Sequence, residues 1–449
     1  MIGAQELIEA ALAESRVDGA VVLVTDTSEA SLRWANSTMT TNGVSTSRTW
    51  AVVSVIGTSV GVVSSTSVDT IDIAAVVRSS EDAARAAGPA RDAAPLVSGH
   101  TAEPAWDDPV AHTEIEVFTQ LARELAAGFA GTDVLYGFAQ HQLATTWLGS
   151  STGLRRRFTQ PTGSVEVNAK RDGSSAWAGV STRDFTDVDL PGMLEDLSTR
   201  LGWGRRQLEL PAGRYETLLP SSAAVDLMIY LAWTMEGRGA QEGHTALSRA
   251  GGTRVGEKLT DLPLTLAFDP FAPGLEYAPF VAATSSDDAT SVFDNGMDAG
   301  RVELVRDGVV NALTYPRAAA AEFGAPVAVP GDNLLLTGGS AASLADMVAS
   351  TERGLLLTCL WYIREVDPAT LLVTGLTRDG VYLVEDGQVT GEVNNFRFNE
   401  SPLDLLRRVS EVGATERTLA REWKDWFTRT AVAPMRIPDF HMSSASKAR

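Results

Sequence analysis

Cysteine is almost absent from this sequence of 449 residues, in which Cys359 is the single example. A lone cysteine excludes an internal disulfide and any metal cluster held by several thiolates, and it is typical of proteins from a reducing compartment. Long apolar runs are missing too, because no stretch approaches the roughly 18 residues that a membrane-spanning helix needs. We therefore expect a cytoplasmic protein that does not cross a membrane.

Positive charge is scarce as well. The sequence has 37 Lys and Arg residues against 57 Asp and Glu residues, which gives a formal net charge of −20 at pH 7. Phosphate backbones repel such an acidic chain, so we expect no nucleic-acid partner. The opening residues carry Glu6, Glu9 and Glu14 but no basic cluster, and they predict an amphipathic helix rather than a signal peptide.

Histidine pairs with the spacing of metal ligands are also missing. A zinc peptidase usually carries two His one helical turn apart, together with a Glu base. The five histidines are too far apart in the sequence for HExxH or HExxxH: they are His100, His112, His141, His244 and His441. Cys359 lies in an apolar run, LLLTCLWYI, without the electropositive surroundings that a reactive thiolate needs. We predict neither a metal site nor a catalytic residue in this chain.

The sequence does contain the composition of an ordinary globular protein, and its first half contains the same order of predicted elements twice. Each unit has a helix, a meander of short β-rich runs separated by polar segments, and a second helix. The first unit comprises residues 2–12, runs within 20–63, and 69–87; the second comprises 113–129, runs within 133–181, and 191–201. We infer a duplicated helix–meander–helix unit, with residues 88–108 as the linker.

The chain changes character after residue 211. Residues 221–235 predict a helix that is apolar nearly all round and therefore buried. From residue 251 to residue 392 short strands alternate with turns, which include the hairpin pairs Asp307–Gly308 and Asp386–Gly387. The predicted fold class is α+β, with an N-terminal α/β domain over residues 1–218 and a β-rich C-terminal domain over residues 219–449.

The order of several segments, rather than any single motif, resembles the TldD/PmbA (TldE) family, which is related to metalloproteases and to modulators of gyrase. The resemblance rests on Glu236-Gly237-Arg238, Ser248-Arg249-Ala250-Gly251, Val255-Gly256-Glu257 and Asp269-Pro270, and then on residues 375–389 (GLTRDGVYLVEDGQV) and 433–437 (APMRI). It extends over essentially the whole chain and implies a two-domain subunit with a β-rich C-terminal half.

The resemblance also implies a cytosolic zinc-dependent protease that pairs an active TldD-type subunit with a TldE/PmbA-type partner. The family's active subunit carries HExxxH on a helix at the start of the second half, and a cysteine ligand before the final strand. Here the matching helix, residues 223–235, offers Asp226 and Tyr230 but no His, and residues 426–433 contain no Cys. Without a metal to activate water, peptide hydrolysis lacks its nucleophile.

The resemblance therefore implies the non-catalytic, TldE/PmbA-like subunit, which completes a chamber and binds extended peptide. Zinc is expected in the HExxxH-bearing partner and not in this chain. An exposed strand can hold an extended peptide by main-chain pairing. Candidate contacts with substrate or partner are Arg238, His244, Trp361, Tyr362 and Arg364.

Two alternatives stay open at this point. The first is a stand-alone peptidase that uses Cys359 with His244 as base, or a dispersed His/Asp/Glu site. The second is a pure interaction protein that modulates another machine, such as a toxin or topoisomerase system.

Overall fold

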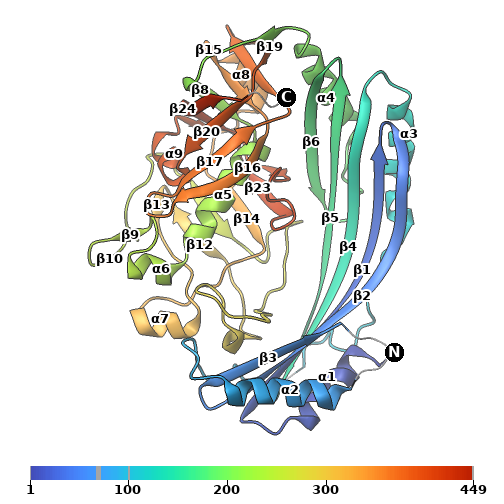
Figure 1. Ribbon diagram of the computed structural model, residues 1–449, viewed down its shortest axis with the longest axis vertical. Helices are drawn as coiled ribbons and strands as arrows, with labels where there is room; N and C mark the ends of the chain where they lie inside the picture. The colour runs from blue at the N-terminus through green and yellow to red at the C-terminus, as the bar shows by residue number, and fades with distance from the viewer. Residues whose placement is uncertain (1, 67–71, 100–101, 447–449) are drawn as a thin grey trace.

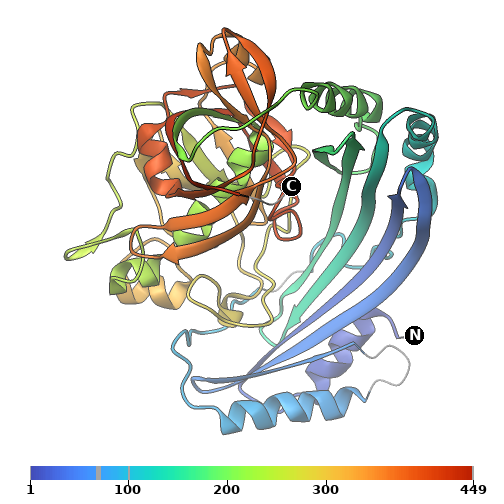
Figure 2. The same cartoon turned by 45° about the horizontal axis from the view of Figure 1, so that its top comes forward.

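The computed structural model describes residues 2–66, 72–99 and 102–446. The chain forms two halves that lie side by side. The first is a long curved sheet with helices near both of its ends, and the second is a rounder body that is rich in strands (Figures 1 and 2). Among the described residues, each helix is too short or too polar to cross a bilayer.

The first half contains a six-stranded antiparallel sheet in the order β3-β2-β1-β4-β5-β6. Its strands are β1 (Gly19–Ala35), β2 (Thr38–Ile56), β3 (Ser59–Ser65), β4 (Val134–Ser150), β5 (Arg155–Arg171) and β6 (Ser174–Thr182). Its helices are α1 (Ala4–Glu14), α2 (Ile73–Ala86), the 3-10 helix η1 (Ile115–Phe118), α3 (Thr119–Phe129) and α4 (Leu190–Trp203). Each unit is helix, three strands, helix, and the two units meet where β1 pairs with β4. The predicted duplication is confirmed, although residues 69–71 of the second predicted helix lie outside the described ranges.

The strands are longer than the sequence pattern predicts. β1 and β4 each span two of the predicted runs, and β2 includes residues 38–47, which the pattern assigns to a polar connection. These ten residues are all exposed, so no alternation of apolar and polar side chains marks them as a strand. They are strand because all of them except Thr40, which lies at a β-bulge, pair with β1 across the turn at Asn36 and Ser37, whose φ angles are 52° and 53°.

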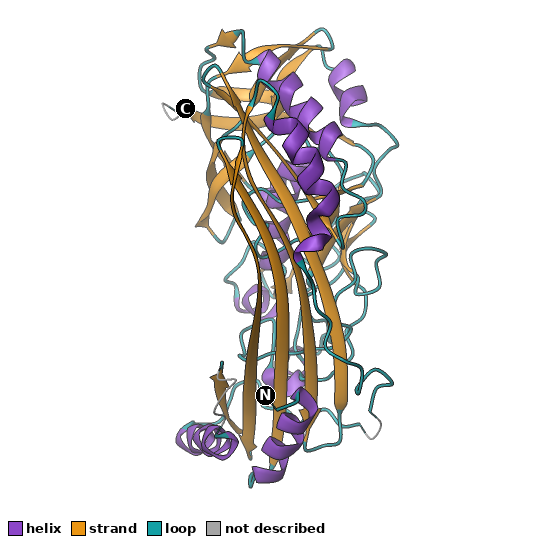
Figure 3. Ribbon diagram, turned by 90° about the vertical axis from the view of Figure 1, so that its right-hand side faces the viewer, coloured by secondary structure: helices purple, strands orange, loops and turns teal. Residues whose placement is uncertain are grey.

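The helices lie along the face of the long sheet that is turned away from the second half (Figure 3). Leu121 and Leu125 of α3 pack with Trp34 of β1 in one buried apolar cluster. At the other end of the sheet, Leu7 of α1 packs with Trp50 of β2 in a second cluster. This burial of apolar side chains fixes which face of the sheet remains for the second half.

The second half contains two sheets. The first has the order β13-β12-β11-β14-β23-β22, and the second has the order β16-β17-β20-β24-β8-β15-β18-β19-β7, with β21 beside β24. The first sheet consists of β11 (Thr265–Phe268), β12 (Val302–Arg306), β13 (Val309–Val310), β14 (Asn333–Thr337), β22 (Glu416–Thr418) and β23 (Arg429–Val432). The second consists of β7 (Gln207–Leu208), β8 (Gly213–Leu219), β15 (Arg353–Leu357), β16 (Leu360–Asp367), β17 (Leu372–Thr377), β18 (Val381–Glu385), β19 (Gln388–Val393), β20 (Phe396–Glu400), β21 (Glu411–Val412) and β24 (Met435–Ala445).

The other elements of this half are short apart from one helix. They are α5 (Ser221–Thr234), α6 (Gly237–Glu242), the hairpin of β9 (Ser248–Arg249) and β10 (Gly252–Thr253), the 3-10 helix η2 (Val292–Asp294), α7 (Arg317–Phe323), α8 (Leu344–Ala349) and α9 (Pro402–Arg408). As predicted, α5 is buried on most sides, and it belongs to an apolar cluster with strands of both sheets. The α+β class with a strand-rich second half is confirmed.

Two predicted hairpin turns are confirmed as well. Asp307–Gly308 joins β12 to β13 and Asp386–Gly387 joins β18 to β19, and all four φ angles are positive. Strand β8 pairs with β15 and β24 of the second half. The domain boundary between residues 218 and 219 stays a prediction.

Candidate functional site

Helix α5 carries a buried carboxyl group, Asp226, at the start of the second half. The carboxylate accepts the main-chain N–H groups of Arg421, Glu422 and Trp423 at 3.1 to 3.2 Å. Burial raises the pKa of Asp226 to about 8, although these three donors favour the charged form. Asp226 therefore fixes the loop at residues 421–423 against α5 and does not face solvent.

Four aromatic side chains pack together near the end of α5, two from the helix and two from residues 423–427. The ring centroid of Tyr230 lies 5.6 Å from that of Trp233 and 5.4 Å from that of Trp423. Trp233 also lies 5.0 Å from Trp423 and 6.0 Å from Phe427. We call these residues, Tyr230, Trp233, Trp423 and Phe427, the α5 aromatic cluster. Trp233 remains 39% exposed, so the cluster reaches the surface.

Three of the predicted contact residues lie together on β16, beside this cluster. Tyr362 is 55% exposed, and its N–H donates to the Glu422 carboxylate at 3.0 Å. Arg364 lies 4.4 Å from the centroid of the Tyr362 ring and forms an ion pair with Glu422 at 3.0 Å. The Tyr230 hydroxyl donates to the Ile363 carbonyl at 3.2 Å, which joins β16 to the α5 aromatic cluster.

The other two predicted contact residues lie elsewhere, on α6 and in the turn after it (Figure 1). Arg238 is only 3% exposed, and its guanidinium forms ion pairs with Glu322 at 2.6 Å and with Glu242 at 3.4 Å. His244 is largely exposed and has Glu242 at 3.7 Å. The structure thus separates the five predicted residues into two groups, and a contact of either group with a ligand stays a prediction.

Arg421 joins the α5 region to the first half. It is 8% exposed, and its guanidinium carbon lies 4.7 Å from the ring centroid of Trp361 and 5.2 Å from that of Trp177 on β6. Glu166 of β5 at 3.6 Å and Asp379 at 3.9 Å balance its charge. A buried cation needs such partners, because an unpaired charge away from water is costly.

A second cation strengthens this contact between the halves. We call the contact of Arg421 and Lys424 with Glu166 and Trp177 the seam. Lys424 donates to both carboxylate oxygens of Glu166 at 2.9 Å, and the Trp177 indole N–H donates to the same group at 3.0 Å. Burial alone would raise the pKa of Glu166, but Lys424, Trp177 and Arg421 outweigh it and hold that pKa below its ordinary value. The Glu166 carboxylate is therefore a structural anion.

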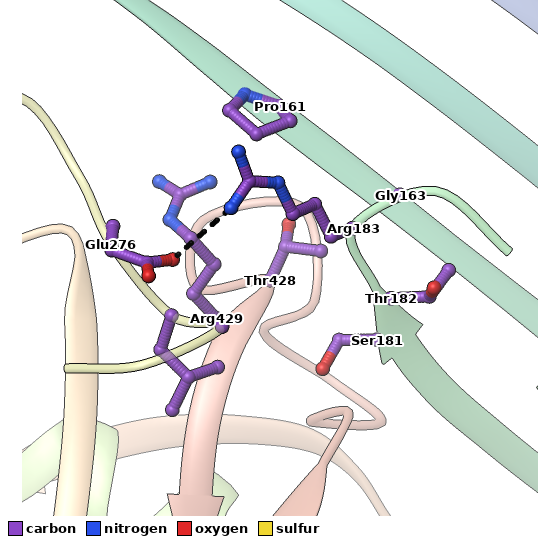
Figure 4. A pocket seen from close by; sticks show the side chains of 10 residues that line it. Pro161, Gly163, Ser181, Thr182, Arg183, Glu276, Thr428 and Arg429 are labelled. Atoms are coloured by element: carbon purple, nitrogen blue, oxygen red, sulfur yellow. Dashed lines mark ion pairs between the residues drawn. The ribbon is translucent and has the colours of Figure 1, made fainter. Parts of the chain in front are cut away.

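A small pocket lies further along the seam (Figure 4). Its lining residues are Pro161, Gly163, Ser181, Thr182 and Arg183 from the first half and Gly274, Leu275, Glu276, Thr428 and Arg429 from the second. Arg183 and Glu276 face each other across it at 3.9 Å. Its volume of about 10 Å³ has room for about one water molecule, so a ligand does not fit it in this conformation.

A family model described as the PmbA/TldA metallopeptidase C-terminal domain matches residues 212–444, just over half of the chain. This chain belongs to the PmbA/TldD family. No protein with a curated description matches its sequence.

Three solved structures share the fold of this PmbA/TldD-family chain over almost its whole length. TldE from Thermococcus kodakarensis has a TM-score of 0.76 at 15% identity and is matched over 97% of this chain and 99% of its own. A protein described as a modulator of a DNA gyrase from Thermotoga maritima has a TM-score of 0.78 at 14% identity, over 98% and 100%. One with the same description from Bacteroides thetaiotaomicron has 0.77 at 15% identity, over 99% and 100%. At these identities the likeness shows the fold alone.

The side chains of α5 do not fit the zinc that the PmbA/TldD resemblance implies. The residues of α5 with the spacing of H, E and H in HExxxH are Val225, Asp226 and Tyr230. Val225 has no atom that could bind a metal, Asp226 accepts three main-chain N–H groups, and the Tyr230 hydroxyl donates to a carbonyl. In the described ranges, no group of three or more His, Cys, Asp or Glu side chains is placed to hold a metal ion. His100 lies outside those ranges. We derive no step through a metal in this PmbA/TldD-family chain.

Cys359 does not have the surroundings of a nucleophile either. It is 1% exposed and packs in a small cluster with Trp177 and Leu419. Burial raises the pKa of the Cys359 thiol, so the thiolate is disfavoured. His244, which the sequence offers as its base, is instead largely exposed in the turn that follows α6.

Sequence reasoning did not find the residues of the seam. Glu166 and Lys424 are 258 positions apart, and no local pattern relates them. The run at residues 421–427, REWKDWF, did carry a signal, because it combines three aromatic and four charged residues just before the last strands. Aromatic residues and Arg are enriched at contact surfaces, so Arg421 and the three aromatic residues of this run were the signal.

Proposed function

We propose that this chain is the non-catalytic subunit of a TldD/TldE-type metalloprotease, and that it holds extended peptide for an HExxxH-bearing paralogue. The observation that carries the proposal is the α5 donor set, in which an apolar residue, a buried capping carboxylate and a tyrosine replace possible ligands. Family membership supports the relation to the protease. The partner would supply the metal that activates water.

β16 and the α5 aromatic cluster are the surface that we assign to the peptide. β16 is the last strand on its side of the ten-stranded sheet, so its outer edge can accept another strand. Glu422 already binds the Tyr362 N–H, and Tyr230 binds main-chain groups of residues 363 and 365, so we assign the peptide strand to the end of β16 that follows Glu365. Val366 in this stretch is 58% exposed.

Exposed aromatic rings would give this surface its preference. Trp426, which is 75% exposed, directly precedes Phe427 of the α5 aromatic cluster. Trp233 of that cluster and Tyr362 of β16 are exposed as well. Aromatic rings bury large apolar areas at low entropic cost, and they dominate the energy of many interfaces. We therefore expect extended peptides with apolar side chains to bind better than acidic or highly charged ones.

Peptide binding by the isolated chain tests this assignment. We expect Tyr362→Asn to weaken the binding of an unstructured, fluorescein-labelled apolar peptide at least tenfold in fluorescence anisotropy. Asn is chosen because it tolerates the positive φ of 54° at this position. The matched control is Phe271→Asn, since Phe271 is an equally prominent aromatic, 66% exposed, outside this surface.

Two results would count against the peptide surface. Unchanged affinity in Tyr362→Asn would show that β16 is not in contact with the peptide. Equal losses in Tyr362→Asn and Phe271→Asn would show that the peptide adheres to exposed aromatics in general.

A further inference from the structure

Glu365 of β16 carries a carboxylate that has no partner. Among the described residues, neither a hydrogen bond nor an ion pair engages its side chain. Its neighbour Asp367 is engaged, because its carboxylate accepts from the Ala369 N–H at 3.0 Å and from the Thr370 hydroxyl at 2.7 Å. Burial and the charge of Asp367 both raise the pKa of Glu365, so no nearby cation compensates this carboxylate.

The charges around the Tyr230 hydroxyl show the same imbalance. This hydroxyl contacts the main chain of residue 365, which places Glu365 beside the α5 aromatic cluster. The charges that act on it most are those of Arg364, Glu365 and Glu422. Arg364 and Glu422 form an ion pair with each other at 3.0 Å. Glu365 is therefore left as the uncompensated charge next to the α5 aromatic cluster.

Aromatic rings in this region already bind guanidinium groups. The guanidinium carbon of Arg364 lies 4.4 Å from the ring centroid of Tyr362, and that of Arg421 lies 4.7 Å from the ring centroid of Trp361. The negative face of an aromatic ring attracts a cation, and a planar guanidinium also stacks on the ring. The same interaction is available to a guanidinium that another molecule supplies.

Two exposed indole rings at this surface lack such a cation. Trp233 is 39% exposed and Trp426 is 75% exposed. In the described part of the chain, no Lys or Arg lies over either ring. The Trp233 ring lies 5.6 Å from that of Tyr230, whose hydroxyl contacts residue 365. An unpaired carboxylate and an uncovered indole ring thus occur next to one another.

We infer that this surface selects an arginine side chain at one position of the extended peptide. The guanidinium pairs with the Glu365 carboxylate and stacks on Trp233, and the apolar neighbours of the arginine contact the other exposed rings. Arginine fits better than lysine, because a planar guanidinium can stack on a ring and pair with a carboxylate at the same time. The inference rests on the proposed peptide-binding function and adds to it the chemistry of one side chain.

Two peptides that differ at one position test the inference. Both are unstructured, fluorescein-labelled and otherwise apolar, with Arg or Leu at the centre, and fluorescence anisotropy with the full chain gives their dissociation constants. The Arg peptide is expected to bind about tenfold more tightly, through one cation–π contact and one ion pair. Glu365→Gln and Trp233→Leu are each expected to lower this ratio of affinities by about threefold or more.

Glu352→Gln is the matched control, because a chain with a net charge of −20 attracts any cationic peptide. Glu352 is an exposed carboxylate just before β15, away from β16 in Figure 1. This variant loses the same charge as Glu365→Gln and is expected to keep the ratio of the wild type. Unchanged far-ultraviolet circular dichroism shows that the variants are folded.

The outcomes separate this inference from the proposed function. Equal affinities of the two peptides for the wild type would overturn the arginine preference and leave the peptide surface in place. A ratio that survives in Glu365→Gln or in Trp233→Leu, or that falls equally in Glu365→Gln and Glu352→Gln, would do the same. Failure of both peptides to bind would overturn the peptide surface and the arginine preference together.

Discussion

Asp226 shows most clearly how a buried polar side chain can be engaged by the packing of the chain. It stands on the helix where the resemblance places metal ligands, yet its carboxylate is used to fix three main-chain N–H groups of the loop at residues 421–423. Tyr230, one turn on, is likewise used within the structure, by the Ile363 carbonyl. Both of these side chains thus serve the packing of the second half.

The Asp226 carboxyl predicts a pH dependence of stability. Its pKa of about 8 in the folded chain exceeds the ordinary Asp value, so the folded chain keeps a proton that the unfolded chain releases between about pH 4 and pH 8. The stability linked to that proton is complete below this window and is lost as the pH rises through it. We expect the free energy of unfolding of Asp226→Asn, from urea titrations, to fall less steeply between pH 5 and pH 8 than that of the wild type.

Asp226→Leu provides the comparison for the capping role. It leaves the buried N–H groups without their acceptor and is expected to lower the free energy of unfolding by about 3 kcal/mol. Equal slopes with pH for the wild type and Asp226→Asn would contradict the assigned titration.

For single residues, the sequence reveals which metal-binding side chains are absent more readily than which side chains are buried or paired. The lack of His at the α5 positions and of Cys at residues 426–433 can be read directly. The burial of Arg238 cannot, because its partner Glu322 comes from a distant helix. Arg421 likewise gains its importance from Trp177 and Glu166, which only the docked halves bring near.

At the scale of elements, periodicity predicted what was amphipathic or uniformly apolar. The α5 helix and the repeated helix–meander–helix units were found because burial leaves a pattern in the sequence. The sequence did not predict the full length of β2, because residues 38–47 are exposed on both faces and are strand only through main-chain pairing with β1. A strand without a buried face has no hydrophobic signature.

The contact of α2 with the sheet predicts the effect of one glycine. A Cβ atom on Gly61 of β3 would overlap the Ser80 carbonyl oxygen and the Ala84 nitrogen of α2, which packs there through the Ser80 hydroxyl. We expect Gly61→Ala to lower the free energy of unfolding by about 1–3 kcal/mol, measured by urea denaturation, because backbone atoms cannot move aside cheaply.

Gly202→Ala is the control for that measurement. Gly202 lies in α4, and a Cβ atom there meets nothing within 4 Å. Alanine is the better helix former, so the control is expected to gain up to about 1 kcal/mol. A Gly61→Ala variant as stable as the control would show that α2 does not lie close against β3.

At the scale of the whole molecule, the seam explains why the two halves act as one body. Arg421 and Lys424 of the second half meet Glu166 of the first, and Trp177 closes the contact with its ring and its indole N–H. The same docking places β16 and the α5 aromatic cluster on the side of the second half, next to the residues of the seam. The surface that we propose for extended peptide therefore lies beside a rigid frame, and under the proposed function the water-activating group comes from another chain.

The most direct test of this account is the rate of peptide cleavage by the isolated full chain compared with its equimolar mixture with an HExxxH-bearing paralogue. The account predicts no turnover by the isolated chain, and turnover in the mixture that a zinc chelator abolishes. Cleavage by the rigorously purified chain alone, at a rate that the paralogue does not raise, would contradict it.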